Sequence, residues 1–481
     1  MKTNNFEQFN LKKEILSSIE KLGYKTPTEV QEKVIPLVLK NKDVIVKSKT
    51  GSGKTAAFAI PLCEKIELLS NNPKALILTP TRELCVQVKE DITNIGRLNR
   101  IRCAAIFGKQ PFKAQVDELK QRVHIVVGTP GRTLDHINRG TINLEEIKYL
   151  VIDEADEMLN MGFIEEVEEI INKLPKDRTT MLFSATIPEE IEYLCNKHMN
   201  AYEKVDVNTE AVTNENISDA CYIVEEKNKY TFLRDLTYVS NPESCIIFCN
   251  TREKVELVTS RLRANKYSVN CLHGGMQQND RLNVIKSFKR GEFSFLVATD
   301  VLARGIDVEK VSLIVSYNIP LEKESYVHRI GRAGRSGEKG KAITLVTPYE
   351  DKFLKEIEQY IGRKIEILQE LDKTNIEKAK EAFHKKQLEV PKIKKDKAFE
   401  LNKEVCKLYI SAGKKKKIRA IDIVGTISSI EGINGEDIGI IDIQDNFSYV
   451  DILNKKEKLV VEALKNKTIK GKKVRCEKAE K

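Results

Sequence analysis

Residues 48–55 read SKTGSGKT and form the part of the chain whose chemistry is easiest to infer. An apolar run at residues 43–47 precedes them and an apolar helix-forming stretch begins near Ala56, which is the setting of a phosphate-binding loop. Two glycines let backbone N–H groups approach phosphate oxygens, Lys54 would neutralise the β- and γ-phosphates, and the Thr55 hydroxyl would bind Mg2+. The expected nucleotide-binding residues are Ser48, Lys49, Thr50, Gly51, Ser52, Gly53, Lys54 and Thr55. A chance Gly-Ser turn is the alternative, since the general pattern has glycine at position 48.

Residues 153–156 read DEAD and begin at the last residue of the predicted strand at 149–153. A carboxylate at the carboxyl end of a strand in an open α/β sheet faces the ligand crevice. Asp153 would therefore hold the Mg2+, directly or through water, and Glu154 would polarise the attacking water. An acidic cap for the following helix is the alternative. The presence of both residues favours a single Mg-nucleotide site, in which Lys54 contacts the phosphates and Asp153 holds the metal.

These side chains need a sheet that brings several strand ends together. Short apolar runs alternate with longer amphipathic stretches, which predicts two α/β domains with parallel sheets and a ligand cleft between them. Predicted strands of the first domain lie at residues 43–47, 75–79, 124–128, 149–153 and 180–184. A polar linker at residues 208–218 precedes the predicted strands of the second domain at 244–249, 268–272, 293–299, 311–317 and 342–347.

The last quarter of the chain has a different pattern. A Lys-rich connector, helical or flexible, is expected at residues 371–403. Beyond it we predict strands at 407–411, 438–443, 447–453 and 469–476 and helices at 418–428 and 455–465. That order is βαββαβ, which RNA-recognition motifs share with many domains that have no RNA function.

A length of 481 residues corresponds to about three domains. No apolar run approaches the roughly 18 residues of a spanning helix, and the N-terminus lacks the apolar core of a signal peptide, so we expect a cytoplasmic protein without a membrane partner. The ten cysteines contain no Cys-x-x-Cys pair, which indicates reduced thiols rather than a zinc site or disulfides. No heptad repeat is evident, so a monomer is expected.

The net charge of +10 is confined to one end of the chain. Residues 373–481 hold 27 basic and 17 acidic side chains, whereas the first 372 residues hold equal numbers of each. A neutral body with a basic appendage indicates a separate module that binds a polyanion.

The motifs from about Phe6 to Leu368 resemble, in order, those of the DEAD-box ATP-dependent RNA helicases. Phe6, with the later GYKTPTEVQ that ends at Gln31, is similar to the adenine-reading Q motif, because a Gln amide can both donate to and accept from an adenine edge. The other motifs are PTREL (80–84), TPGR (129–132), SAT (184–186), IIFCNTR (246–252), HGGMQQNDR (273–281), ATDVLARGID (298–307) and YVHRIGRAGR (326–335). The resemblance implies two tandem RecA-like domains, at residues 1–207 and 219–370.

The same resemblance implies roles for residues of both domains. Ser184 and Thr186 would couple hydrolysis to strand separation, Asp307 would reach the ribose, and His328 would link to the attacking water. Arg332 and Arg335 are three residues apart, so on a helix both would point the same way and act as arginine fingers on the γ-phosphate. A solvated helix face is the alternative for that pair.

RNA contacts in this family are mainly to the sugar-phosphate backbone, which hydroxyls and backbone N–H groups can hold without a large positive charge. The resemblance transfers this role to Thr81, Arg82, Thr129, Gly131, Arg132, Gly274, Gly275, Thr299 and Arg304. The chain departs from the family at Gly108-Lys109, where relatives have Gly-Gly. Lys109 would either add a phosphate contact or restrict the backbone, and both interpretations stay open.

Residues 404–481 resemble the RNA-binding domain of the DbpA-like subgroup, most clearly at KLYISAGKKKKIRAIDIVGTI (407–427). The subgroup implies an α+β, RRM-like domain that recognises a hairpin of large-subunit ribosomal RNA and works on pre-ribosomal particles. Its expected RNA contacts are Lys414, Lys415, Lys416, Lys417 and Arg419, with a solvated loop as the alternative. Tyr409, Phe447 and Tyr449 would either stack on RNA or pack in the core.

The sequence thus predicts an ATP-dependent RNA helicase that uses ATP and Mg2+ and remodels ribosomal RNA. A DNA-directed helicase is an alternative, because the phosphate-binding loop and arginine fingers do not distinguish the two sugars. An RNA clamp that holds RNA without unwinding it is another.

Overall fold

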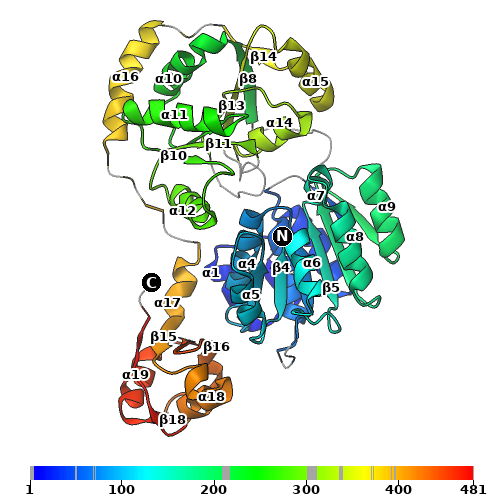
Figure 1. Cartoon of the computed structure of the whole chain (residues 1–481), viewed down its shortest axis with the longest axis vertical. Helices are drawn as coiled ribbons and strands as arrows, with labels where there is room; N and C mark the ends of the chain where they lie inside the picture. Colours follow the sequence, from blue (N-terminus) through cyan, green and yellow to red (C-terminus); the bar gives the residue numbers. More distant parts are fainter. Residues whose placement is uncertain are drawn as a thin grey trace. The chain divides into compact units, whose positions relative to one another are not determined.

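The computed structural model contains three α/β or α+β domains (Figure 1). It describes residues 5–48, 51–68, 70, 72–207, 217–300, 311–334, 340–369, 371, 373–389, 391, 393–394 and 397–479. None of the helices in these ranges is both long and apolar enough to cross a membrane. All ten cysteines are free thiols, as the sequence predicts, and seven of them are buried.

The first domain is built on a parallel sheet of seven strands. Their spatial order is β3 (Cys103–Ile106), β4 (Ile125–Gly128), β2 (Ala75–Leu78), β5 (Tyr149–Asp153), β6 (Thr179–Ser184), β1 (Val44–Lys47) and β7 (Glu203–Asp206). The helices are α1 (Lys13–Lys21), α2 (Glu29–Leu39), α3 (Lys54–Lys65), α4 (Arg82–Ile95), α5 (Phe112–Leu119), α6 (Pro130–Asn138), α7 (Ala155–Asn160), α8 (Ile164–Lys173) and α9 (Glu189–His198). All five strands predicted for this domain are confirmed, and β3 and β7 are additional.

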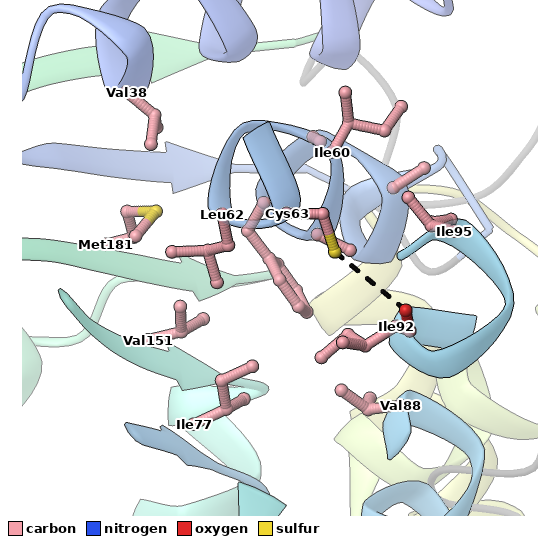
Figure 2. Packing of buried hydrophobic residues seen from close by; sticks show 14 of the residues in the cluster. Val38, Ile60, Leu62, Cys63, Ile77, Val88, Ile92, Ile95, Val151 and Met181 are labelled. Carbon is pink, nitrogen blue, oxygen red and sulfur yellow. Dashed lines mark hydrogen bonds between the residues drawn. The ribbon is translucent and has the colours of Figure 1, made fainter. Parts of the chain in front are cut away.

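Both faces of this sheet are buried over its central strands, which is why those strands are mainly apolar, whereas edge strand β7 buries only its valine. One set of alternating side chains, with Ile77, Val151 and Met181, packs under α2, α3 and α4 (Figure 2). Figure 2 also shows the Cys63 thiol of α3 directed at the carbonyl of Ile92 in α4, at 3.9 Å. The other set faces α7, α8 and α9. This packing fixes the carboxyl ends of the strands, where the motif residues lie.

The second domain repeats the architecture with seven parallel strands. Their order is β10 (Val269–Leu272), β11 (Phe295–Ala298), β9 (Cys245–Phe248), β12 (Leu313–Ser316), β13 (Gly340–Val346), β8 (Ile217–Ile223) and β14 (Glu366–Ile367). The helices are α10 (Lys229–Ser240), α11 (Arg252–Ala264), α12 (Gln278–Lys289), α14 (Lys323–Ile330), α15 (Asp351–Ile361) and α16 (Lys373–Gln387). The five predicted strands are confirmed, β8 and β14 are additional, and β8 includes the last two residues of the predicted linker.

Helix α16, which belongs to the predicted Lys-rich connector, packs on this second domain. Its Phe383 is fully buried against the rings of Tyr238, Tyr267 and Phe295, with ring centroids 4.8 to 5.9 Å apart. Figure 1 shows α16 beside α10, the helix that carries Tyr238. The first half of the connector is therefore a helix held by an aromatic cluster.

The C-terminal domain has an antiparallel sheet with the strand order β16 (Ile438–Ile443), β17 (Ser448–Ile452), β15 (Cys406–Ile410) and β20 (Cys476–Lys478). Helices α18 (Ala420–Ser428) and α19 (Glu457–Asn466) cover one face, and α17 (Phe399–Glu404) precedes β15. The predicted strand at 469–476 is wrong. Residues Thr468–Ile469 and Lys472–Lys473 form a hairpin (β18, β19), because Lys470 and Gly471 both have positive φ and close a two-residue turn.

Candidate nucleotide and RNA site

The carboxyl edge of the first sheet divides the predicted site residues into two neighbouring groups. The phosphate-binding loop follows β1, the DEAD residues follow β5 and the SAT residues follow β6, and these three strands are adjacent. The predicted RNA residues follow β2 and β4, and the Gly108-Lys109 pair follows β3. Strand order therefore places the residues predicted to bind the nucleotide, here called the nucleotide half, beside those predicted to bind RNA, here called the RNA half, on one edge.

The phosphate-binding loop joins β1 to α3 as expected. Gly51 and Gly53 have φ of 84° and 89°, a conformation that favours glycine, and α3 begins at Lys54. The Lys54 ammonium donates to the carbonyl of Ser48 at 3.2 Å, and Thr55 is half-buried next to it. Backbone N–H groups at a helix N-terminus can bind phosphate. Lys49 and Thr50 lie outside the described residues.

Gln31, in α2, forms hydrogen bonds that hold this loop. Its amide nitrogen donates to the carbonyl of Gly53 at 3.1 Å, and its amide oxygen accepts from the backbone of Thr28 at 3.0 Å. The Thr28 hydroxyl in turn donates to the carbonyl of Ser52 at 2.8 Å. A Cβ on Gly53 would lie only 2.5 Å from the Gln31 amide nitrogen, so the close approach of Gln31 to residue 53 requires glycine. Thr28 belongs to the site, although sequence reasoning did not single it out.

Phe6, predicted to bind the nucleotide, is buried in a small aromatic group. It makes edge contacts with Phe9 at 6.1 Å and Tyr24 at 6.3 Å between ring centroids. These rings pack in the same apolar cluster as α2, the helix that carries Gln31. Phe6 therefore fixes the segment that leads to the Q motif.

Asp153 lies at the end of β5 and is buried. Burial raises the pKa of its carboxyl to about 7, against the opposite effect of Lys54. Its Oδ1 atom has no hydrogen-bond partner in the described part of the chain. A buried carboxylate oxygen without a donor, beside a hydroxyl residue at a phosphate-binding loop, fits an Mg2+ ligand. Glu154 follows in a left-handed conformation, with φ of 55°, and begins the turn into α7.

Asp156 connects the DEAD and SAT residues. Its Oδ2 accepts from the backbone N–H of Thr186 at 2.9 Å, from the Thr186 hydroxyl at 3.1 Å and from the N–H of Ala185 at 3.2 Å. Its own N–H donates to the hydroxyl of Ser184 at 3.1 Å. Asp156 was not among the predicted site residues, although the DEAD motif contains it. These bonds join the first turn of α7 to the end of β6 and the turn that follows it.

The predicted RNA residues of the first domain lie where helices α4 and α6 begin. Thr81 caps α4 by accepting from the N–H of Leu84 at 3.3 Å, and Arg82 is the first residue of that helix. Thr129 stands at the N-cap position of α6, whose second residue, Gly131, is exposed. Hydroxyls and N–H groups at two helix N-termini are the donors that phosphate oxygens accept.

In the second domain, Gly274 and Gly275 follow β10 and Thr299 follows β11, the two neighbouring strands at one edge. A Cβ on Gly275 would lie 2.6 Å from a guanidinium nitrogen of Arg252, so that cation lies against the glycine. Arg304, Asp307 and Arg335 lie outside the described residues.

Helix α14 carries His328 and is held by two neighbouring side chains. Arg329 is fully buried, with two guanidinium nitrogens 2.5 Å from the Asp300 carboxylate. Tyr326 donates to Asp219 at 2.6 Å. The expectation that Arg332 lies on a helix is wrong. The helix ends at Ile330, and the chain turns into a bridge between Ala333 and Val311, so Arg332 is buried in the turn.

The basic loop of the C-terminal domain is exposed and its backbone is fixed. Lys414 and Lys415 donate their N–H groups to the carbonyls of Gln444 and Asp445, each at 2.8 Å. The exposed cations of the loop are Lys414, Lys415, Lys416, Lys417 and Arg419. The β18–β19 hairpin brings two further cations to this loop, since the ammonium groups of Lys470 and Lys472 donate to the carbonyls of Lys417 and Lys416. Sequence reasoning missed these two lysines, and the Lys-Gly turn was the signal for them.

Tyr409, Phe447 and Tyr449 form an aromatic group on the C-terminal sheet, with ring centroids 5.2 to 6.0 Å apart. They are half-buried, and their neighbours Leu408 and Val450 point into the core under the helices. Successive side chains of a strand face opposite sides. The three rings therefore lie on the face opposite the helices.

Family models match all three domains. The DEAD/DEAH box helicase model matches residues 28–194, the helicase conserved C-terminal domain matches 228–337, and the DbpA RNA binding domain matches 407–478. The ATP-dependent RNA helicase DbpA of Bacillus subtilis is 55% identical over 478 residues, which cover 99% of this chain and 100% of that protein. The DEAD-box ATP-dependent RNA helicase CshA of Geobacillus kaustophilus is 45% identical over 75% of this chain and 77% of its own length.

Solved structures agree with this assignment. S. cerevisiae Dbp5 bound to RNA and ADP BeF3 is 30% identical, with a TM-score of 0.71 over 80% of this chain and 100% of that one. Mss116p bound to ssRNA and AMP-PNP is also 30% identical, with a TM-score of 0.68 over 80% of this chain and 82% of that one. The RecA-like fold of both parallel-sheet domains is confirmed. The chain belongs to the DEAD-box ATP-dependent RNA helicases, is an RNA-dependent ATPase, and carries a DbpA RNA-binding domain at its C-terminal end.

Proposed function

We propose that this helicase remodels large-subunit ribosomal RNA during ribosome assembly and that its C-terminal domain directs it there. The observation that carries the proposal is the exposed basic loop of that domain, with Lys470 and Lys472 beside it. The loop backbone is fixed by hydrogen bonds, so the cations are presented on a rigid support. A rigid basic loop suits a folded RNA, whose phosphates stand at fixed positions.

The division of charge supports the same assignment. The first 372 residues have no net charge, so the RecA-like domains would hold RNA through hydroxyls, backbone N–H groups and a few cations. Such contacts do not depend on base sequence. Selection of one RNA then falls to the basic C-terminal domain, where Tyr409, Phe447 and Tyr449 offer half-exposed rings for stacking.

The nucleotide half would work as follows. Lys54 holds the β- and γ-phosphates, and Glu154 orients and polarises the attacking water. Thr55 and Asp153 would hold Mg2+, which neutralises charge on the phosphates when bound. Asp156 transmits the state of this half to Ser184 and Thr186 through the hydrogen bonds described above.

The second domain would supply the remaining groups. Asp307 is proposed to contact the ribose, and His328, Arg332 and Arg335 to act on the γ-phosphate and the attacking water. Arg304, with Gly274, Gly275 and Thr299, is proposed to hold the RNA backbone.

The proposal includes a cytoplasmic location, a single working chain and pre-ribosomal particles as partners. Ten free thiols agree with a reducing compartment.

The test compares ATP turnover stimulated by large-subunit ribosomal RNA with turnover stimulated by an unrelated RNA of equal length. The full chain is expected to prefer the ribosomal RNA. Replacing Lys414, Lys415, Lys416, Lys417 and Arg419 together with Gln should remove the preference and leave the response to unrelated RNA. A triple Gln variant of Lys455, Lys458 and Lys465, which are exposed lysines of the same domain, is the control. Equal stimulation of the wild-type chain by both RNAs would contradict the proposal.

A further inference from the structure

Lys109 adopts a backbone conformation that usually belongs to glycine. Its φ is 60°, in the loop that joins β3 to α5, and its side chain is exposed. A side chain in the left-handed region costs conformational energy that glycine avoids, so the surrounding structure must hold it there. Lys109 therefore combines a strained backbone with an ammonium group that is exposed to solvent.

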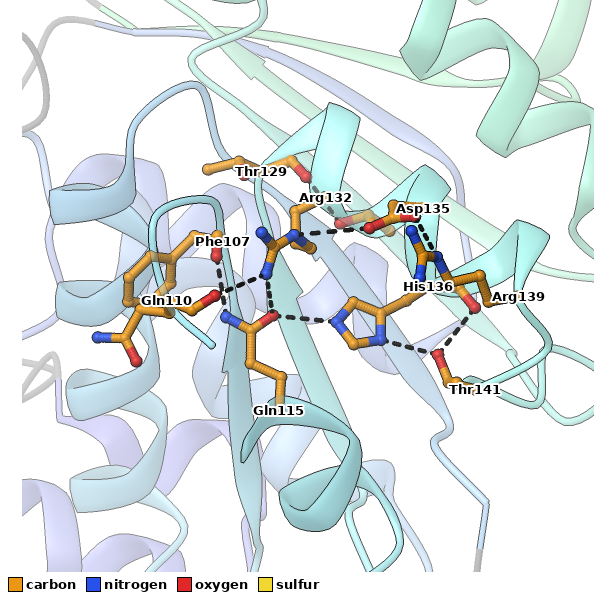
Figure 3. Close-up of polar contacts among 10 residues, drawn as sticks. Phe107, Gln110, Gln115, Thr129, Arg132, Asp135, His136, Arg139 and Thr141 are labelled. Carbon is orange, nitrogen blue, oxygen red and sulfur yellow. Dashed lines mark hydrogen bonds and ion pairs between the residues drawn. The ribbon is translucent and has the colours of Figure 1, made fainter. Parts of the chain in front are cut away.

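Two side chains hold this loop from inside the domain. The buried amide of Gln115 donates to the carbonyl of Phe107 at 2.8 Å, on one side of Lys109. A guanidinium nitrogen of Arg132 donates to the carbonyl of Gln110 at 3.2 Å, on the other side. The same nitrogen also donates to the Gln115 amide oxygen at 3.1 Å, as Figure 3 shows. The backbone around Lys109 is thus tied to Arg132.

His136 completes the support. The Gln115 amide nitrogen donates to a carbonyl, and the Gln115 amide oxygen faces the Arg132 guanidinium. An amide oxygen can only accept, so Nε2 of His136, 3.0 Å from that oxygen, is the donor. Nδ1 of His136 lies 2.7 Å from the hydroxyl of Thr141 (Figure 3). The Phe112 ring stacks on His136, with centroids 4.1 Å apart and planes within 14°. The histidine is locked on three sides.

The loop also lies against Arg82. A Cβ on Gly108 would be 3.4 Å from a guanidinium nitrogen of Arg82, the first residue of α4. Arg82 and Arg132 are the two cations proposed to hold the RNA backbone on this half of the edge. Lys109 follows Gly108 directly and its side chain is exposed, so its ammonium is available to a ligand that binds next to these two cations.

We propose that Lys109 is a further contact to the RNA backbone, and that Gln115 and His136 are positioning residues that hold Lys109 and Arg132 in place. The proposal rests on the RNA-binding role proposed above for Arg82 and Arg132. The ligand group is a phosphate, because a lysine ammonium acts as a flexible point charge and has no geometry that reads a base edge.

The first test is the salt dependence of single-stranded RNA binding by the full chain. Loss of one phosphate contact lowers the slope of log K against log salt by about 0.7 for a single strand. Lys109→Gln removes the charge and Lys109→Gly removes both charge and strain, so both should lower the slope equally. Lys113→Gln, an exposed lysine on α5, is the matched control and should keep the wild-type slope. A wild-type slope in both Lys109 variants would overturn the proposal.

The second test addresses the positioning role. Gln115→Leu should raise the RNA concentration needed for half-maximal ATP turnover about tenfold, with little change in kcat or in the KM for ATP. In a chain that already carries Lys109→Gln, the same change should cost less, because the two residues act on one contact. Fully additive losses would contradict the positioning role. If the wild-type chain showed no RNA-dependent turnover, the proposed function would fail instead, so the two failures are distinguishable.

Discussion

Asp156 holds Thr186 at two atoms: its carboxylate accepts from the Thr186 backbone N–H at 2.9 Å and from the hydroxyl at 3.1 Å. Asp156 is the second residue of α7, the helix that follows β5, and Thr186 lies in the turn after β6, so the bonds join the segments that follow two adjacent strands. Hydrogen bonds to an ionised carboxylate are stronger than neutral ones. A change at the nucleotide would therefore reach the SAT turn through a stiff connection.

Asp156→Asn is expected to separate ATP turnover from unwinding. An Asn side chain keeps the shape but replaces one acceptor oxygen with a donor, so some of the four accepted hydrogen bonds are lost. Bonds to a charged group are worth about 1.5 to 3 kcal/mol, which corresponds to a loss of roughly 10- to 100-fold in duplexes unwound per ATP. Parallel ATPase and strand-displacement assays measure this ratio. Asp177→Asn, at an exposed aspartate, is the control, and an unchanged ratio in Asp156→Asn would refute the coupling.

Gln31→Leu is expected to loosen the phosphate-binding loop. The substitution removes the hydrogen bonds to Gly53 and Thr28, each worth about 1 kcal/mol. Together they predict a rise in the KM for ATP of about tenfold or more. The affinity for RNA measured without nucleotide should stay unchanged, because the RNA half of the edge does not contact this residue. Equal weakening of ATP and RNA binding would indicate general unfolding instead.

His136 makes the stability of the first domain depend on pH. Burial lowers its pKa to about 4, from an ordinary value of 6.5. Between these two values the unfolded chain binds the extra proton and the folded chain does not, so stability is complete above pH 6.5 and is lost as the pH falls toward 4. Burial lowers the pKa of His124 to about 4 as well, so it contributes in the same window. The charged groups near His136 are Arg132, Asp135 and Arg139.

The measurement is urea unfolding at pH 8, 7.5, 6 and 5. Each histidine contributes at most about 1.4 kcal/mol per pH unit within the window. His136→Gln should therefore lose stability less steeply than the wild-type chain below pH 6.5, with the remaining slope due in part to His124. Above pH 7 the two slopes should coincide. An identical slope at low pH would show that His136 is not kept neutral by the fold.

In the first sheet the five central strands could be predicted from the sequence, and the two edge strands, β3 and β7, could not. β5 was predicted at its observed bounds, because YLVID is apolar and rich in β-forming residues. β3 reads CAAI and its alanines carry no strand preference, whereas β7 reads EKVD and buries only its valine. Such strands form because neighbouring strands offer free backbone groups, which is a tertiary effect.

The connector shows a similar limit. Residues 371–403 have a weak helical period and many lysines, so the sequence left a helix and a flexible segment as equal alternatives. The structure settles this for α16, because Phe383 packs against three rings contributed by α10, β11 and the residue Tyr267. A buried aromatic residue anchors this helix, and its partners Tyr238, Tyr267 and Phe295 come from distant parts of the sequence.

The candidate site was predicted where motifs are contiguous and missed where contacts are distant. The sequence identified Lys54, Asp153 and Glu154 but not the role of Gln115, because its partners come from the loop after β3 and from α6. The same limit applies to Arg332, which lies between the C-cap residue Gly331 of α14 and the bridge that Ala333 forms with the distant Val311. Such relationships depend on which segments the fold places together.

The most direct test of the account is RNA-stimulated ATP turnover by Glu154→Gln. Gln keeps the size of the side chain but cannot polarise water as a carboxylate does, so we expect normal ATP and RNA binding with turnover reduced by roughly 100-fold or more. ATP binding is measured on the same preparation, together with the wild-type chain. Unimpaired turnover in this variant would contradict the assignment of the catalytic site.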